Sequence, residues 1–211
     1  MTGIIDLLNS DLGKSIISGV SGQTNQPQNK TQDVLAMGLP VLMAAMKRNA
    51  ATPQGAEGLM TALSGQHDGS ILDNIDDLFG GGVDDSVIND GGKILDHVLG
   101  AKQQTIESSL GAKTGMDASS VAQILKIAAP LLMGMLGKQT RDQNVNTSGG
   151  MEDLLGGLLG GSNGQEQNLL ESFLDADGDG SALDDVAGML LGGDKKQDSL
   201  GGLLGGLFGG K

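Results

Sequence analysis

Acidic residues occupy alternate positions near the C-terminal end of the chain, within residues 175–185, DADGDGSALDD. Asp175, Asp177 and Asp179 match positions 1, 3 and 5 of a calcium-binding loop, and Gly180 matches position 6, where such a loop turns sharply. Carboxylates in this register can converge on one hard cation, at oxygen distances of about 2.3–2.6 Å. The spacing therefore predicts a Ca²⁺ site.

The rest of this loop departs from the usual pattern. Ser181, at position 7, is placed to offer its backbone carbonyl, but position 12 is Val186 where a bidentate Glu is usual. We expect Asp184 or Asp185 to complete the shell, and the sequence does not choose between them. Shortened loops of this kind resemble those of dockerins. The alternative interpretation is a solvated acidic turn whose Asp side chains cap the next helix.

Apolar positions on both sides of the loop predict two short helices, NLLESFL before it and DDVAGMLL after it. Residues 165–193 thus have the pattern of an EF-hand-like helix–loop–helix. Other acidic clusters, at 73–77 and 84–85, lack both the alternation and the glycine. We interpret them as solvated helix faces or caps.

Few other residues suggest chemistry. The two histidines are His67 and His97, and neither has a nucleophile or carboxylate partner identifiable from sequence. His97 replaces an apolar residue of an earlier, similar segment, which predicts partial burial on a helix. The glycine-rich stretches do not have the spacing of phosphate-binding loops. We expect a non-enzymatic protein. The alternative is an enzyme or accessory enzyme subunit with a site between the two repeats described below.

Composition narrows the possible partners. The chain has 211 residues, a formal net charge of −13, no Cys and only three aromatic side chains, all Phe. Nucleic-acid binding requires clustered Lys and Arg, so the charge argues against it. No uncharged run reaches the roughly 20 residues of a membrane span, and the N-terminus lacks the basic start of a signal peptide. We expect a cytoplasmic protein, with envelope association left open, and no cofactor besides Ca²⁺.

Two apolar segments predict the core helices. Residues 34–47, VLAMGLPVLMAAMK, and residues 121–137, VAQILKIAAPLLMGMLG, each have a central proline, Pro40 or Pro130. Proline inside a helix predicts a kink. Their methionines fill a core that lacks large aromatic rings. The alternative is an exposed Met-rich groove that binds a partner helix.

The two core segments belong to a longer internal similarity. Residues 2–9 resemble 92–99, residues 15–20 resemble 105–110, Thr24 matches Thr114, and Pro40 matches Pro130, always 90 positions apart. The constant offset indicates a duplicated helical unit; the alternative is shared compositional bias. We predict four regions: a first repeat (1–90), a second repeat (91–164), the calcium-loop helix–loop–helix (165–193) and a flexible Gly/Leu-rich tail (194–211).

Local signals complete the prediction. The 37 glycines predict short helices. Polar loops are expected at 23–32, 50–55 and 139–150, and Thr52 is a possible helix cap before Pro53.

The segment 91–139, with its Ile-Leu-x-His helix (ILDH), its Thr-Gly-Met turn and its Ala-Pro-x-x-Met-Gly helix (APLLMG), resembles the bacterial DUF937 family, which is similar to the YidB-like helical proteins. The resemblance implies an all-helical fold, and it implies no known activity or catalytic residues. We therefore predict an all-α, calcium-binding protein that acts structurally or by protein binding, with an unidentified protein partner or self-association.

Overall fold

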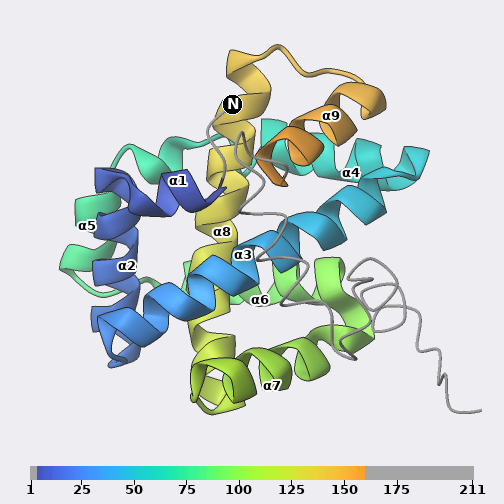
Figure 1. Cartoon of the computed structure of the whole chain (residues 1–211). Helices are drawn as coiled ribbons and strands as arrows, with labels where there is room; N and C mark the ends of the chain where they lie inside the picture. Colours follow the sequence, from blue (N-terminus) through green and yellow to red (C-terminus); the bar gives the residue numbers. More distant parts are fainter. Residues whose placement is uncertain (1–3, 160–211) are drawn as a thin grey trace, which may run out of the picture. The chain divides into compact units, whose positions relative to one another are not determined.

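The computed structural model describes residues 4–159, and these residues form helices without any β-strand (Figure 1). The all-α prediction is confirmed for this part of the chain. The helices are α1 (Ile4–Asn9), α2 (Asp11–Thr24), α3 (Gln28–Ala50), α4 (Pro53–Ser64), η1 (Ser70–Leu72), α5 (Ile75–Gly80), α6 (Asp85–Leu99), η2 (Gly100–Lys102), α7 (Gln103–Thr114), α8 (Ala118–Asp142) and α9 (Ser148–Leu159).

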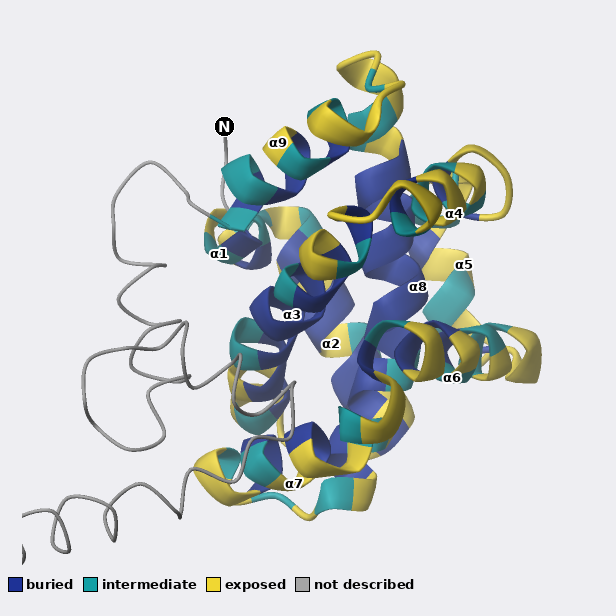
Figure 2. Ribbon diagram, turned by 90° about the vertical axis from the view of Figure 1, so that its right-hand side faces the viewer, coloured by how far each residue is buried: buried dark blue, intermediate teal, exposed yellow. Residues whose placement is uncertain are grey.

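Helix α8 forms the centre of the fold. Every residue from 127 to 137 is buried, and α2, α3, α4, α6, α7 and η1 all contact this helix. Figure 2 shows it buried along most of its length. By length and composition α8 could cross a membrane, but 83% of its most apolar window is buried inside the protein. This burial is that of a core helix, whose apolar side chains are covered by other helices.

Helix α3 crosses α8 and is the second core helix (Figure 1). Both helices continue through their central prolines, Pro40 and Pro130. With 23 and 25 residues, they are longer than the short helices that the glycine content predicted. Long helices form despite local glycines because tertiary packing of an apolar face contributes more to helix stability than propensity does.

The predicted loops are shorter in the structure. The loop expected at 23–32 is confined to 25–27, because α3 begins at Gln28 with polar residues that face solvent for one turn. The loop expected at 139–150 is likewise reduced to 143–147, because α8 extends to Asp142. Both predictions equated polar sequence with loop, whereas the exposed end of an amphipathic helix is also polar.

The cap predicted at Thr52 is confirmed. Its hydroxyl accepts a hydrogen bond from the Gly55 backbone N–H at 3.1 Å, and Pro53 occupies the first position of α4. This satisfies one of the free N–H groups at the helix start.

Two helical turns have matching geometry 90 residues apart. Helix α2 ends at Thr24 and α7 at Thr114, and each is followed by a left-handed residue, Asn25 (φ 56°) or Gly115 (φ 66°). The next residue in each turn donates its N–H to a carbonyl five residues earlier, Gln26 to Ser21 at 3.1 Å and Met116 to Gly111 at 2.9 Å. This is the bond of a Schellman motif, which ends both helices in the same way.

Close approach of α6 to α8 depends on one glycine. A Cβ at Gly91 would overlap the backbone carbonyl of Lys126 in α8, whereas a Cβ at the next residue, Gly92, would lie 3.9 Å from the Lys126 side chain. The absence of a side chain at Gly91 therefore allows the two backbones to touch.

We predict opposite effects for alanine at these neighbouring glycines. Gly91→Ala should destabilise the protein by about 1–3 kcal/mol, because the new methyl group pushes α6 away from α8. Gly92→Ala is the matched control and should stabilise the protein by about 0.5–1 kcal/mol through helix propensity. Urea unfolding of both variants measures the difference. Equal effects would show that α6 does not approach α8 closely at Gly91.

Candidate functional site

The predicted calcium ligands lie outside the described residues. Asp175, Asp177, Asp179, Ser181, Asp184 and Asp185 all follow residue 159, so this site remains a prediction from sequence. Within residues 4–159, the Asp, Glu and His side chains do not form a group of three or more that could hold a metal ion. The acids at 73, 76, 77, 84 and 85 are all exposed, as expected of solvated helix faces.

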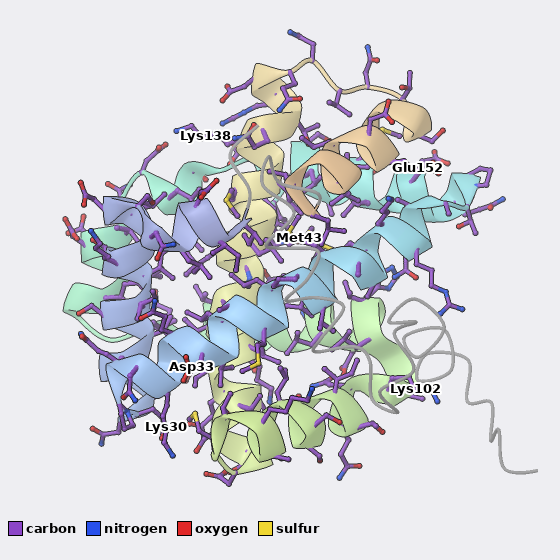
Figure 3. All side chains as sticks on the ribbon, viewed as in Figure 1. Lys30, Asp33, Met43, Lys102, Lys138 and Glu152 are labelled. Carbon is purple, nitrogen blue, oxygen red and sulfur yellow. The ribbon has the colours of Figure 1, made fainter. Side chains whose placement is uncertain are left out.

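The two matching turns contact each other reciprocally through polar groups. Gln26, in the first turn, donates its side-chain N–H to the Ser120 hydroxyl at 3.0 Å, at the start of α8. Lys30, at the start of α3, donates its ammonium to the Gly115 carbonyl at 2.6 Å, in the second turn. Figure 3 labels Lys30 beside the second turn. Each turn thus binds the first helical residues that follow the other turn, and this arrangement is called the turn clasp below.

Asp117 organises the α8 side of the turn clasp. Its carboxylate accepts hydrogen bonds from the Ser119 hydroxyl, from the Ser120 hydroxyl at 2.7 Å and from the Ser120 backbone N–H at 2.9 Å. These hydrogen bonds, with Ser119 the largest contributor, hold the pKa of the Asp117 carboxyl well below its usual range. The carboxylate therefore stays ionised near neutral pH and caps the N-terminus of α8, where a negative charge is favourable.

His67 is a buried polar residue that the sequence did not identify as paired. It is 7% exposed, and its Nε2 atom lies 3.6 Å from Oδ2 of Asp90 on α6. The two residues are 23 positions apart in sequence, so only the fold brings them together. His97, by contrast, was predicted to be partly buried and is exposed. That prediction was wrong because α6 turns this position toward solvent, although the equivalent Leu7 is half-buried.

Glu107 is a second buried group that the sequence missed. It is 8% exposed, and its Oε1 atom accepts a hydrogen bond from the Gln103 amide at 2.7 Å, one turn earlier on α7. Ile17 occupies the matching position on α2 and is also buried. A carboxylate in place of an aliphatic side chain could have been noticed as a break in the apolar pattern.

An apolar pocket lies between helices of the first and second halves of the described residues. Its walls are aliphatic side chains: Leu7, Leu8, Leu12, Ile16, Leu35, Leu39, Leu72, Ala128, Leu131, Leu132 and Met135. This lining provides no acid or base that could transfer a proton.

Four of the five core methionines are buried and do not form an exposed groove. Met43, Met46, Met133 and Met135 are all buried, and Figure 3 labels Met43 on α3. Met37 is half-buried. This placement agrees with the core-filling interpretation, in which flexible thioethers occupy irregular gaps.

The depressed pKa of Asp117 predicts an acid sensitivity. A carboxylate whose pKa is lowered in the folded state stabilises the protein at pH values above the pKa that it has in the unfolded chain. This stabilisation is lost as the pH falls below about 4. Asp117→Asn keeps a capping oxygen but cannot titrate. The melting temperature should therefore fall less between about pH 4 and 2 in this variant than in the wild type. Asp33→Asn, on the exposed face of α3, is the control. Parallel pH curves for the wild type and Asp117→Asn would contradict the assignment.

Comparison with known proteins identifies the family. Residues 6–139 match the family described as bacterial protein of unknown function (DUF937). Searches of curated proteins and of solved structures each find no match. The match spans more than half of the chain, including α3, most of α8 and the turn clasp. The chain belongs to the DUF937 family.

Proposed function

We propose that this protein is a non-enzymatic, calcium-binding helical protein that acts structurally or by binding another protein. The observation that carries the proposal is the register of Asp175, Asp177 and Asp179 with Gly180. Oxygen ligands at alternate positions, followed by a residue free to turn sharply, are what a calcium loop requires. In this proposal Ser181 contributes its carbonyl, and Asp184 or Asp185 completes the shell.

The charge of the surrounding segment supports a cation as ligand. Residues 165–193 carry seven acids and no Lys, Arg or His: Glu166, Glu171, Asp175, Asp177, Asp179, Asp184 and Asp185. Like charges this close together oppose a compact turn, and a divalent cation offsets their repulsion. Calcium binding should therefore stabilise the fold of this segment by mass action.

We further infer that residues 4–159 contain two diverged copies of one helical unit. The matching ends of α2 and α7, the left-handed Asn25 and Gly115 and the reciprocal turn clasp support the inference. A contact in which each copy presents a corresponding region to the other is typical of two-fold association between similar units. The copies would then act as a scaffold that presents the calcium-binding segment.

No observation favours the enzymatic alternative over this proposal. A site between the two copies would fall at the apolar pocket, whose aliphatic walls suit packing rather than acid–base chemistry.

Calorimetry with CaCl₂ on the full chain tests the calcium site. We expect a dissociation constant of about 10⁻⁶ M or weaker, since the usual Glu at position 12 is missing, and weaker binding of Mg²⁺, which requires a smaller octahedral shell. The double variant Asp177→Ala, Asp179→Ala should lose binding. Asp76→Ala, Asp77→Ala removes two exposed acids elsewhere and should keep it. No heat with millimolar Ca²⁺, or equal binding by both variants, would refute the proposal.

A reciprocal substitution tests the duplication. Thr31 in α3 is 0% exposed and its hydroxyl has no hydrogen-bond partner, whereas the matching residue of α8 is Val121, also 0% exposed. Thr31→Val should stabilise the protein by about 1 kcal/mol, because it removes an unpaired buried hydroxyl. Val121→Thr should destabilise it by about 1–3 kcal/mol for the same reason.

Chemical denaturation measures both effects. Destabilisation by Thr31→Val would mean that the two positions do not have equivalent environments, whatever the outcome for calcium.

A further inference from the structure

Residues 65–69, which connect α4 to η1, lie directly against α8 at two glycines. A Cβ at Gly137 would overlap the His67 carbonyl oxygen and would lie 3.0 Å from the Leu63 carbonyl. At Gly134 it would lie 3.6 Å from the Cα of Gly69, and 2.6 Å from Cγ2 of Ile71 in η1. The backbone of this connection is therefore seated on α8, and we call residues 65–69 the crossing loop.

Two charged contacts attach the crossing loop to its neighbours. Arg141 of α8 lies 3.6 Å from the Asp68 carboxylate, with side chains 55% and 38% exposed. His67 Nε2 lies 3.6 Å from Asp90 Oδ2 of α6, with side chains 8% and 32% exposed. Pairs between exposed side chains contribute little because water screens them, so the partly buried His67–Asp90 pair is the stronger candidate for a structural role.

The His67–Asp90 contact depends on the charge of the imidazole. At 3.6 Å the two atoms are beyond ordinary hydrogen-bond distance, so a neutral ring gains little from Asp90. An imidazolium gains Coulomb attraction to the carboxylate, and partial burial weakens the screening of that attraction. Histidine is the side chain whose charge ordinarily changes between about pH 5 and 8.

The other charged groups near the crossing loop come from α8 and from the loop itself. Helix α8 contributes Arg141 and Lys138. A Cβ built at Gly69 would lie 3.1 Å from the Cβ of Lys138, which places Lys138 beside the loop. The loop itself contributes Asp68, and the last turn of α4, residues 61–64, has no charged side chain. Two cations and two carboxylates therefore lie near the loop, and among these groups Asp90 is the one that contacts His67.

We propose that His67 and Asp90 form a pH-dependent clamp, which fastens the crossing loop to α6 when the imidazole is protonated and releases this attachment when it is neutral. The clamp links the crossing loop, which follows α4, to α6. It is independent of the proposed calcium site.

A double-mutant cycle on the full chain tests the clamp. The wild type, His67→Gln, Asp90→Asn and the double variant are unfolded with urea at about pH 5 and pH 8, on either side of the histidine range. The cycle isolates the interaction between the two side chains. At pH 5 we expect a coupling of about threefold or more in the unfolding equilibrium constant, and at pH 8 a coupling indistinguishable from one. His97→Gln combined with Asp90→Asn is the control and should show no coupling at either pH.

Hydrogen exchange of the crossing-loop amides provides a second measurement that does not require a His67 variant. The ratio of exchange rates, Asp90→Asn over wild type, cancels the intrinsic dependence of exchange on pH. This ratio of exchange rates should exceed about 3 at pH 5 and approach 1 at pH 8. A coupling of equal size at both pH values, a larger one at pH 8, or a ratio near one at pH 5 would overturn the proposal.

Discussion

Enclosure of α8 is the constraint on which the rest of the described structure depends. A 25-residue helix with eleven consecutive buried residues must be covered on all faces. Helices pack with axes about 8–10 Å apart, so several neighbours can fit around one helix only where side chains are small at the contacts. Gly91 meets this requirement toward α6, and Gly134 and Gly137 meet it toward η1 and the crossing loop. The glycines that weaken isolated helices thus allow dense packing here.

Polar side chains lie at the turns before α3 and α8, where backbone atoms need hydrogen-bond partners. In the turn clasp, Gln26 and Lys30 donate hydrogen bonds to the Ser120 hydroxyl and the Gly115 carbonyl, at the start of α8 and in the turn before it. Asp117 accepts a hydrogen bond from one of the free N–H groups at the start of α8, that of Ser120. Because the two turns share their geometry, one set of interactions positions both core helices. The shared geometry of the two turns is what the proposed duplication would produce.

The acidic residues are distributed differently in the two parts of the chain. In the described residues the paired acids sit beside specific donors, as Asp117, Asp68 and Asp90 do. Residues 165–193 instead concentrate seven acids without any basic residue. A segment of this composition must find its countercharge elsewhere, and the alternating register within it makes a divalent cation a chemically reasonable source.

The sequence by itself determined the fold class, the two core helices and the family resemblance, because apolar periodicity and fixed motif spacing are local signals. It also identified the Thr52–Pro53 helix start, since capping depends on neighbouring residues. Only the tertiary structure decided the lengths of α3 and α8, because both helices continue into polar, exposed residues that read as loops in the sequence. The sequence likewise did not predict the pairing of His67 with Asp90 or the reciprocal turn clasp. Each joins residues distant in sequence, and no local pattern records which helix faces will meet.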